Sequence, residues 1–176
     1  MTLLYIGLAL WWLAHFAKRL TPGLRASMTE KFGLGPAKGL MALLIVFSVI
    51  AMVLGYRAAP VEFMYNTPSW GRHVNNLLML VAIALMGMGS AKGPAGTWLR
   101  HPMLWGTVVW AVAHLLVNGD TASIVLFGGI GIWALTSMVL INMSTDTWVR
   151  PKPGPASADI KWLVISAVVF AVISGL

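Results

Sequence analysis

Of the 176 residues, 59% are hydrophobic and only 10% are charged, and the mean hydropathy is +0.82. Soluble domains carry about 25% charged residues, so this chain lacks the polar surface of a water-soluble protein. It also has no cysteine, which excludes disulfides, thiolate zinc sites, iron–sulfur clusters and covalently attached c-type haem.

Uncharged runs mark the segments that can cross a membrane, because a charge at mid-bilayer is costly. Barrel strands would alternate apolar and polar residues, whereas residues 40–54 are apolar on all sides, with Ser48 as the one polar residue. We therefore predict an all-α, polytopic transmembrane helix bundle that forms a single domain, residues 1–176. About six spans are expected, at Met1–Ala17, Gly39–Tyr56, Val74–Ala91, Pro102–Gly119, Thr121–Thr145 and 162–176, the last extended back to residue 160.

The basic residues predict the orientation of these spans. The second loop holds only Arg57 and Arg72, and the fourth holds none. The other ten lie in the odd-numbered loops, namely Lys18, Arg19, Arg25, Lys31, Lys38, Lys92, Arg100, Arg150, Lys152 and Lys161. By the positive-inside rule the odd loops are cytoplasmic and both termini face outward. The net charge of +7 is then a feature of membrane topology, and no nucleic-acid partner is expected.

Two helix boundaries can be predicted from local signals. Pro102 suits the first position of a helix, and Gly119 suits a helix stop. Asp120 or Thr121 then serves as the N-cap of the next span. For Asp120, capping is the ordinary role and proton handling is the alternative.

The four histidines are the main candidates for chemistry. His15 lies near the cytoplasmic end of the first span and His114 near the outer end of the fourth, both inside apolar runs. An unpartnered imidazole costs free energy in such a run, and neutral imidazole is also a ligand of haem iron. His73 and His101 lie at span ends. All four also have an ordinary interpretation, as interhelical hydrogen-bonding groups or interfacial anchors.

Helix rise gives an expectation about depth. Twelve residues separate Pro102 from His114, which corresponds to about 18 Å along a helix. Depth alone would therefore pair His15 with His101, and His73 with His114. Pairing His15 with His114 instead requires a ligand that lies rather flat in the membrane, or spans that are offset from these boundaries.

Several short motifs together resemble the NnrU family, over most of the chain. They are Leu13–Ala14–His15, Trp70–Gly71–Arg72–His73, Leu99–Arg100–His101–Pro102–Met103–Leu104, and Ala113–His114–Leu115–Leu116–Val117–Asn118–Gly119–Asp120, followed by Leu126–Phe127–Gly128–Gly129. The resemblance implies a protein of the bacterial inner membrane that supports denitrification, in nitrite and nitric oxide reduction. The implied partners are the lipid bilayer, redox or assembly proteins of denitrification, and a small apolar or nitric-oxide-type ligand.

The NnrU family is related to the plastid 15-cis-ζ-carotene isomerase, a membrane enzyme that contains haem b. Carried over by motif, its axial ligands correspond to His15 and His114, and the cofactor implied is haem b. His73 and His101 match other histidines of these relatives and are reserve candidates for cofactor binding. No catalytic residue is implied.

Four functions stay open from the sequence. The first is a haem b protein of denitrification, acting in electron transfer, maturation or nitric oxide handling. The second is a haem-dependent cis–trans isomerase of a carotenoid-like polyene. The third is a cofactor-free membrane assembly subunit. The fourth is a membrane methyltransferase that uses S-adenosylmethionine, because Arg100–Gly106 matches RHPxxxG; the lack of any glutamate after Gly106 speaks against it.

Overall fold

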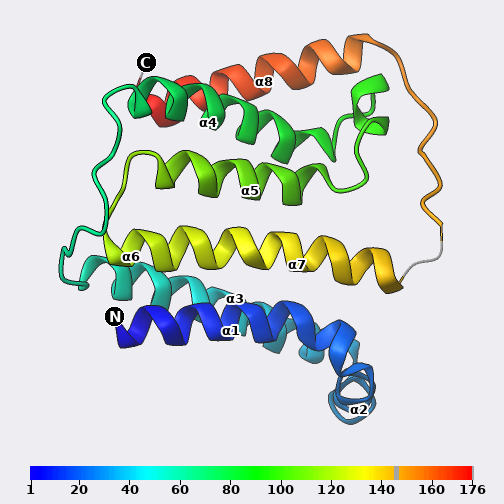
Figure 1. Cartoon of the computed structure of the whole chain (residues 1–176). Helices are drawn as coiled ribbons and strands as arrows, with labels where there is room; N and C mark the ends of the chain where they lie inside the picture. The colour runs from blue at the N-terminus through cyan, green and yellow to red at the C-terminus, as the bar shows by residue number, and fades with distance from the viewer. Residues whose placement is uncertain (145–146, 176) are drawn as a thin grey trace. The chain divides into compact units, whose positions relative to one another are not determined.

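The computed structural model (Figure 1) describes residues 1–144 and 147–175, without the side chains of Lys18, Leu24 and Arg25. Thr145 and Leu176, the predicted ends of two spans, lie outside these residues. Over the described ranges the protein is all-helical, and its only extended pairing is an isolated bridge between Phe63 and Asp120. The chain divides into two compact units. Unit 1 comprises Met1–Met64 and Asp120–Gly129, and unit 2 comprises Tyr65–Gly119 and Ile130–Leu176.

Unit 1 is built on a helical hairpin. Its elements are α1 (Thr2–Leu20), α2 (Pro22–Phe32), α3 (Leu34–Arg57), α6 (Thr121–Ser123) and the π-helical turn η2 (Ile124–Gly128). Helices α1 and α3 pack side by side and antiparallel, and α2 connects them at one end (Figure 1). The approach is close, because a Cβ at Gly55 of α3 would lie 2.3 Å from the backbone nitrogen of Leu4 in α1.

Helix α2 was not predicted. A basic loop was expected between the first two spans, and this expectation is wrong for Pro22–Phe32. The segment is polar and therefore lacks the apolar run that marks a span. Its ends nevertheless carry ordinary helix signals, with Pro22 at the first helical position and Gly33 after the last. Gly33 has a φ of +83°, a backbone conformation that suits glycine.

Unit 2 is centred on α4. Its elements are α4 (Gly71–Met88), the short 3₁₀ turn η1 (Pro94–Thr97), α5 (Pro102–Leu115), α7 (Gly129–Ser144, in this unit from Ile130) and α8 (Ser157–Ser174). Helix α4 packs against both α5 and α8 (Figure 1). The indole Nε1 of Trp162 in α8 donates a hydrogen bond of 2.8 Å to the carbonyl oxygen of Ala84 in α4.

Four stretches of helix are long and apolar enough to cross a membrane: α3, α4, the continuous run from Thr121 to Ser144, and α8. The remaining two apolar helices are shorter, because α1 is apolar only over Thr2–Ala17 and α5 has 14 residues. Fourteen residues rise about 21 Å, less than the roughly 30 Å of a bilayer core. The protein is thus of membrane type, and the expected count of about six spans is not confirmed.

The predicted boundaries are shifted where charged or polar residues continue a helix. Helix α3 begins at Leu34 rather than Gly39 and includes Lys38, and α4 begins at Gly71 and includes Arg72. Helix α5 starts at Pro102 as predicted but ends at Leu115, before Gly119. The apolar surfaces of the long helices face outward; only 6% of the most apolar part of α8 is buried. These surfaces are compatible with a lipid bilayer.

Candidate functional site

The four histidines lie on different elements. His15 is in the second half of α1, in unit 1, whereas the other three belong to unit 2. His73 is in the first turn of α4, His101 immediately precedes α5, and His114 is the next-to-last residue of α5. The side chains of His15, His101 and His114 are half-buried, and that of His73 is exposed.

The imidazole of His15 is held by the preceding turn of its own helix. Its Nδ1 lies 2.8 Å from the carbonyl oxygen of Trp11, and because a carbonyl only accepts, Nδ1 carries the proton. The indole of Trp11 also contacts the imidazole, with 4.2 Å between ring centroids and an interplanar angle of 36°. The lone pair of the neutral ring therefore lies on Nε2.

His114 repeats this arrangement in the other unit. Its Nδ1 lies 2.9 Å from the carbonyl oxygen of Trp110, and the two ring centroids are 4.8 Å apart at 49°. The side-chain amide of Asn118 donates to the carbonyl oxygen of His114 at 2.9 Å. The same tautomer follows, again with the lone pair on Nε2.

Both histidines belong to one short sequence pattern, Trp-x-x-Ala-His, formed by Trp11, Ala14 and His15 and by Trp110, Ala113 and His114. We call it the Trp–Ala–His motif. The alanine is buried in both copies, at 6% and 0% exposure. This repeat was not predicted above, although the matching i−4 and i−1 positions are visible in the sequence. Histidines that ligate metals ordinarily donate their second ring N–H to an oxygen acceptor, often a backbone carbonyl.

The two reserve histidines have other surroundings. The Nε2 of His101 donates to the amide oxygen of Asn142 in α7 at 2.9 Å, so this ring links the start of α5 to the end of α7. His73 lies near the end of α5 that carries His114, because Gly71 packs against the carbonyl oxygen of Leu116. Within unit 2, His73 and His114 therefore share one end of the α4–α5 pair, as the depth argument predicts, and His101 lies at the other end.

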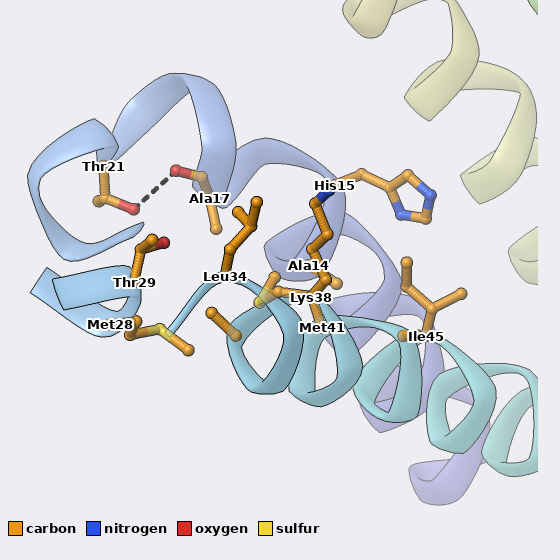
Figure 2. A pocket seen from close by; sticks show the side chains of 12 residues that line it. Ala14, His15, Ala17, Thr21, Met28, Thr29, Leu34, Lys38, Met41 and Ile45 are labelled. Atoms are coloured by element: carbon orange, nitrogen blue, oxygen red, sulfur yellow. Dashed lines mark hydrogen bonds between the residues drawn. The ribbon is translucent and has the colours of Figure 1, made fainter. Parts of the chain in front are cut away.

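A pocket of about 360 Å³ lies beside His15 in unit 1, between α1, α2 and α3. Figure 2 shows its lining side chains, which are mainly apolar, such as those of Met28, Leu34 and Met41, with Lys38 among them. The imidazole of His15 points away from these side chains (Figure 2). His15 thus borders the pocket, but its imidazole, which carries the nitrogen that could ligate a metal, does not point into it.

Asp120 is the N-cap of α6, as predicted. Its carboxylate accepts the Ser123 backbone N–H at 2.9 Å and the Ser123 hydroxyl at 2.6 Å. Because that hydroxyl gives its proton to Asp120, Tyr56 of α3 is the donor in its 2.9 Å bond to Ser123 Oγ. Burial alone would raise the pKa of Asp120, but the hydrogen bonds to its carboxylate, first of all those from Ser123, outweigh burial and lower the pKa below its usual value.

In residues 1–144 and 147–175, no three His, Asp or Glu side chains gather in a group that could hold a metal ion. A metal bound within a macrocycle needs only one or two protein ligands, because the ring supplies the others. Each copy of the Trp–Ala–His motif offers one oriented imidazole. This donor set suits a metal held in a macrocycle.

The family model described as NnrU protein matches residues 3–176. The match covers nearly the whole chain, so the protein belongs to the NnrU family. No curated protein and no solved structure matches the chain.

Proposed function

We propose that this NnrU-family membrane protein binds haem b, and that His15 and His114 supply the axial nitrogen ligands. The observation that carries the proposal is the Trp–Ala–His motif, which occurs once in each unit with the same hydrogen bond and the same ring contact. In both copies the same nitrogen, Nε2, is then the one suited to ligate iron. The resemblance to a haem b enzyme selects the same two residues.

The chemistry of the residues suits this cofactor. With Nδ1–H donated to a carbonyl, the lone pair of each neutral imidazole belongs to Nε2, and neutral imidazole is the form that ligates iron. The chain has no cysteine, so the haem is held without thioether bonds. When bound, haem iron supplies one-electron transfer or the binding of a small ligand such as nitric oxide.

We place the protein in the bacterial inner membrane, in support of nitrite and nitric oxide reduction, because this is what its family resemblance implies. Electron transfer, maturation of a reductase and nitric oxide handling all fit a haem held by two histidines. Binding by two ligands favours electron transfer over ligand binding, since it fills both axial positions.

The visible spectrum of the purified protein tests the proposal. We expect a Soret band in the detergent-solubilised wild type and a loss of most of it in His15→Ala and in His114→Ala. Added imidazole should restore part of the band, because it can replace the missing ligand. Circular dichroism and size-exclusion chromatography check that each variant is folded.

His73→Ala is the matched control, because His73 is exposed and lies outside the Trp–Ala–His motif; its haem content should equal that of the wild type. Full haem in both motif variants would show that the ligands are assigned wrongly. A wild type that shows no Soret band after haem supplementation would instead favour the cofactor-free assembly subunit.

A further inference from the structure

A second cavity lies in unit 2, and no residue of the Trp–Ala–His motif lines it. This cavity is a groove of about 630 Å³ between the C-terminal part of α4 and the N-terminal part of α8. These two helices pack against each other, and both are long and apolar enough to cross a membrane (Figure 1). The groove therefore lies on the part of the protein that is compatible with lipid.

The groove is amphipathic along its length. Ile83 of α4 and Ile165 and Val169 of α8 line its apolar part. Lys92, which follows α4, and Lys161, in the second turn of α8, line its polar end. Both lysine side chains are exposed, and they are the only charged residues of the lining.

The nearby acid, Asp159, is not part of the groove lining. Asp159 of α8 accepts the backbone N–H of Ala95 at 3.1 Å, and its carboxylate packs over Gly93. It is thereby engaged with the loop that contains η1. The first turn of α8 lies at the same end, and the N-terminus of a helix favours an anion.

The floor of the groove is fixed by the contact of α4 with α8. The indole of Trp162 donates to Ala84 and packs against Gly87, where a Cβ would lie 3.3 Å from the indole ring. The buried hydroxyl of Ser166 is bonded to the carbonyl oxygen of Trp162 at 2.9 Å. A groove with such a floor keeps its shape when its outer side is filled.

We infer that this groove binds an anionic phospholipid, with the phosphate between Lys92 and Lys161 and an acyl chain along Ile83, Ile165 and Val169. Two cations at one end and an apolar channel leading from them match the two parts of such a lipid. Basic pockets between transmembrane helices bind anionic headgroups in the same manner. Lys92 and Lys161 also lie at the end of the bundle that the positive-inside rule places in the cytoplasm, so the lipid belongs to that leaflet.

Native mass spectrometry of the purified full chain tests the inference, with phosphatidylglycerol and phosphatidylcholine added at equal concentration. We expect one phosphatidylglycerol to be retained preferentially by the wild type. The double variant Lys92→Gln/Lys161→Gln should lose at least tenfold in this preference, since each basic residue near an anionic headgroup contributes about fivefold. Lys31→Gln, a lysine of α2 in unit 1, is the matched control and should behave like the wild type.

A second variant tests the apolar part of the groove. Ile165→Trp fills the channel at an exposed position of α8, where the larger side chain threatens no buried contact. It should lower phosphatidylglycerol retention with both lysines present. Millimolar inorganic phosphate should not displace the lipid from the wild type. Equal retention of the two lipids by the wild type, unchanged preference in the double lysine variant, or displacement by phosphate alone would each overturn the inference.

Discussion

The histidines differ in which ring nitrogen is engaged. His15 and His114 use Nδ1 to hold a carbonyl of the preceding turn, whereas His101 uses Nε2 to hold Asn142. The sequence could place these rings and name the tryptophans four residues earlier, because that spacing brings side chains together on a helix. It could not assign the ring nitrogens, since they depend on the rotamer that each imidazole adopts.

At the same scale, Asn142 offers a test of the His101 contact. Asn142→Leu removes the acceptor of the Nε2–H bond between the start of α5 and the end of α7. We expect a loss of about 1 kcal/mol in the free energy of unfolding, the usual net value of such a bond. Denaturant titration in detergent measures it. Asn142→Asp keeps an acceptor and should retain most of the stability, whereas an equal loss in both variants would contradict the assigned role.

Gly55 provides a second prediction for a single residue. Gly55→Val in α3 forces a side chain against the backbone of Leu4 in α1. Even a Cβ at residue 55 would lie only 2.3 Å from the backbone nitrogen of Leu4. Because a backbone cannot move aside as a side chain does, we expect α1 and α3 to separate locally, at a cost of about 3 kcal/mol or more. A lower midpoint of thermal unfolding would report it.

The control lies in the same helix. Nothing lies within 4 Å of a Cβ added at Gly39. Gly39→Ala should therefore leave the midpoint unchanged or raise it, because alanine is the better helix former by up to about 1 kcal/mol. Equal destabilisation by the two substitutions would mean that the close contact with Leu4 does not explain the effect at Gly55.

Among the elements, the sequence predicted best those whose signal is an apolar run. All six predicted runs lie largely in helices, and Asp120 caps the helix for which it was proposed. Helix α2 was missed because it has no such run, although Pro22 and Gly33 mark its ends. The π-helical turn η2 was also missed. A π-helical turn contains about one residue more than an α-helical turn, and an uncharged apolar run looks the same with or without it.

The cap of α6 carries a prediction about pH. The folded-state pKa of Asp120, which precedes the membrane-type helix, lies below its ordinary value of 3.8. Its charged form therefore stabilises the fold above that value, and the contribution is lost as the pH falls through the lowered folded-state pKa. Asp120→Ala removes the cap altogether and should cost about 1 kcal/mol at neutral pH.

Asp120→Asn separates the cap from the charge. Asparagine still accepts the Ser123 N–H, so most of the stability at neutral pH should persist. The acid-dependent part should disappear, because the amide does not titrate. Unfolding titrations of the wild type and both variants at neutral and acidic pH give the comparison. A wild-type dependence on pH that survives in Asp120→Asn would assign it to other carboxylates.

For the whole molecule, the sequence established the membrane class and the family but not the number of crossings. Helix length explains why. Four helices are long and apolar enough to span a membrane, whereas the apolar part of α1 and all of α5 are shorter. An uncharged run such as residues 102–119 overstates its helix, because Asn118 and Gly119 are uncharged yet lie beyond the last helical residue, Leu115. The topologies therefore differ in whether α1 and α5 cross, and the crossing of α5 sets the side on which the segments after it lie.

The natural absence of cysteine makes that question testable with single-cysteine variants. Glu62→Cys lies between α3 and α4, and Lys152→Cys lies between α7 and α8. Six spans place three crossings between these positions, so a membrane-impermeant maleimide should label Glu62→Cys in intact cells and Lys152→Cys only after permeabilisation. If α5 does not cross, only α4 and the run from Thr121 to Ser144 separate the two positions, and both cysteines react on the same side.

Lys31→Cys, separated from Glu62 by α3 alone, should react on the opposite side from Glu62→Cys under either topology. Because the positive-inside rule puts Lys31 in the cytoplasm, external labelling of Lys31→Cys would reverse the predicted orientation.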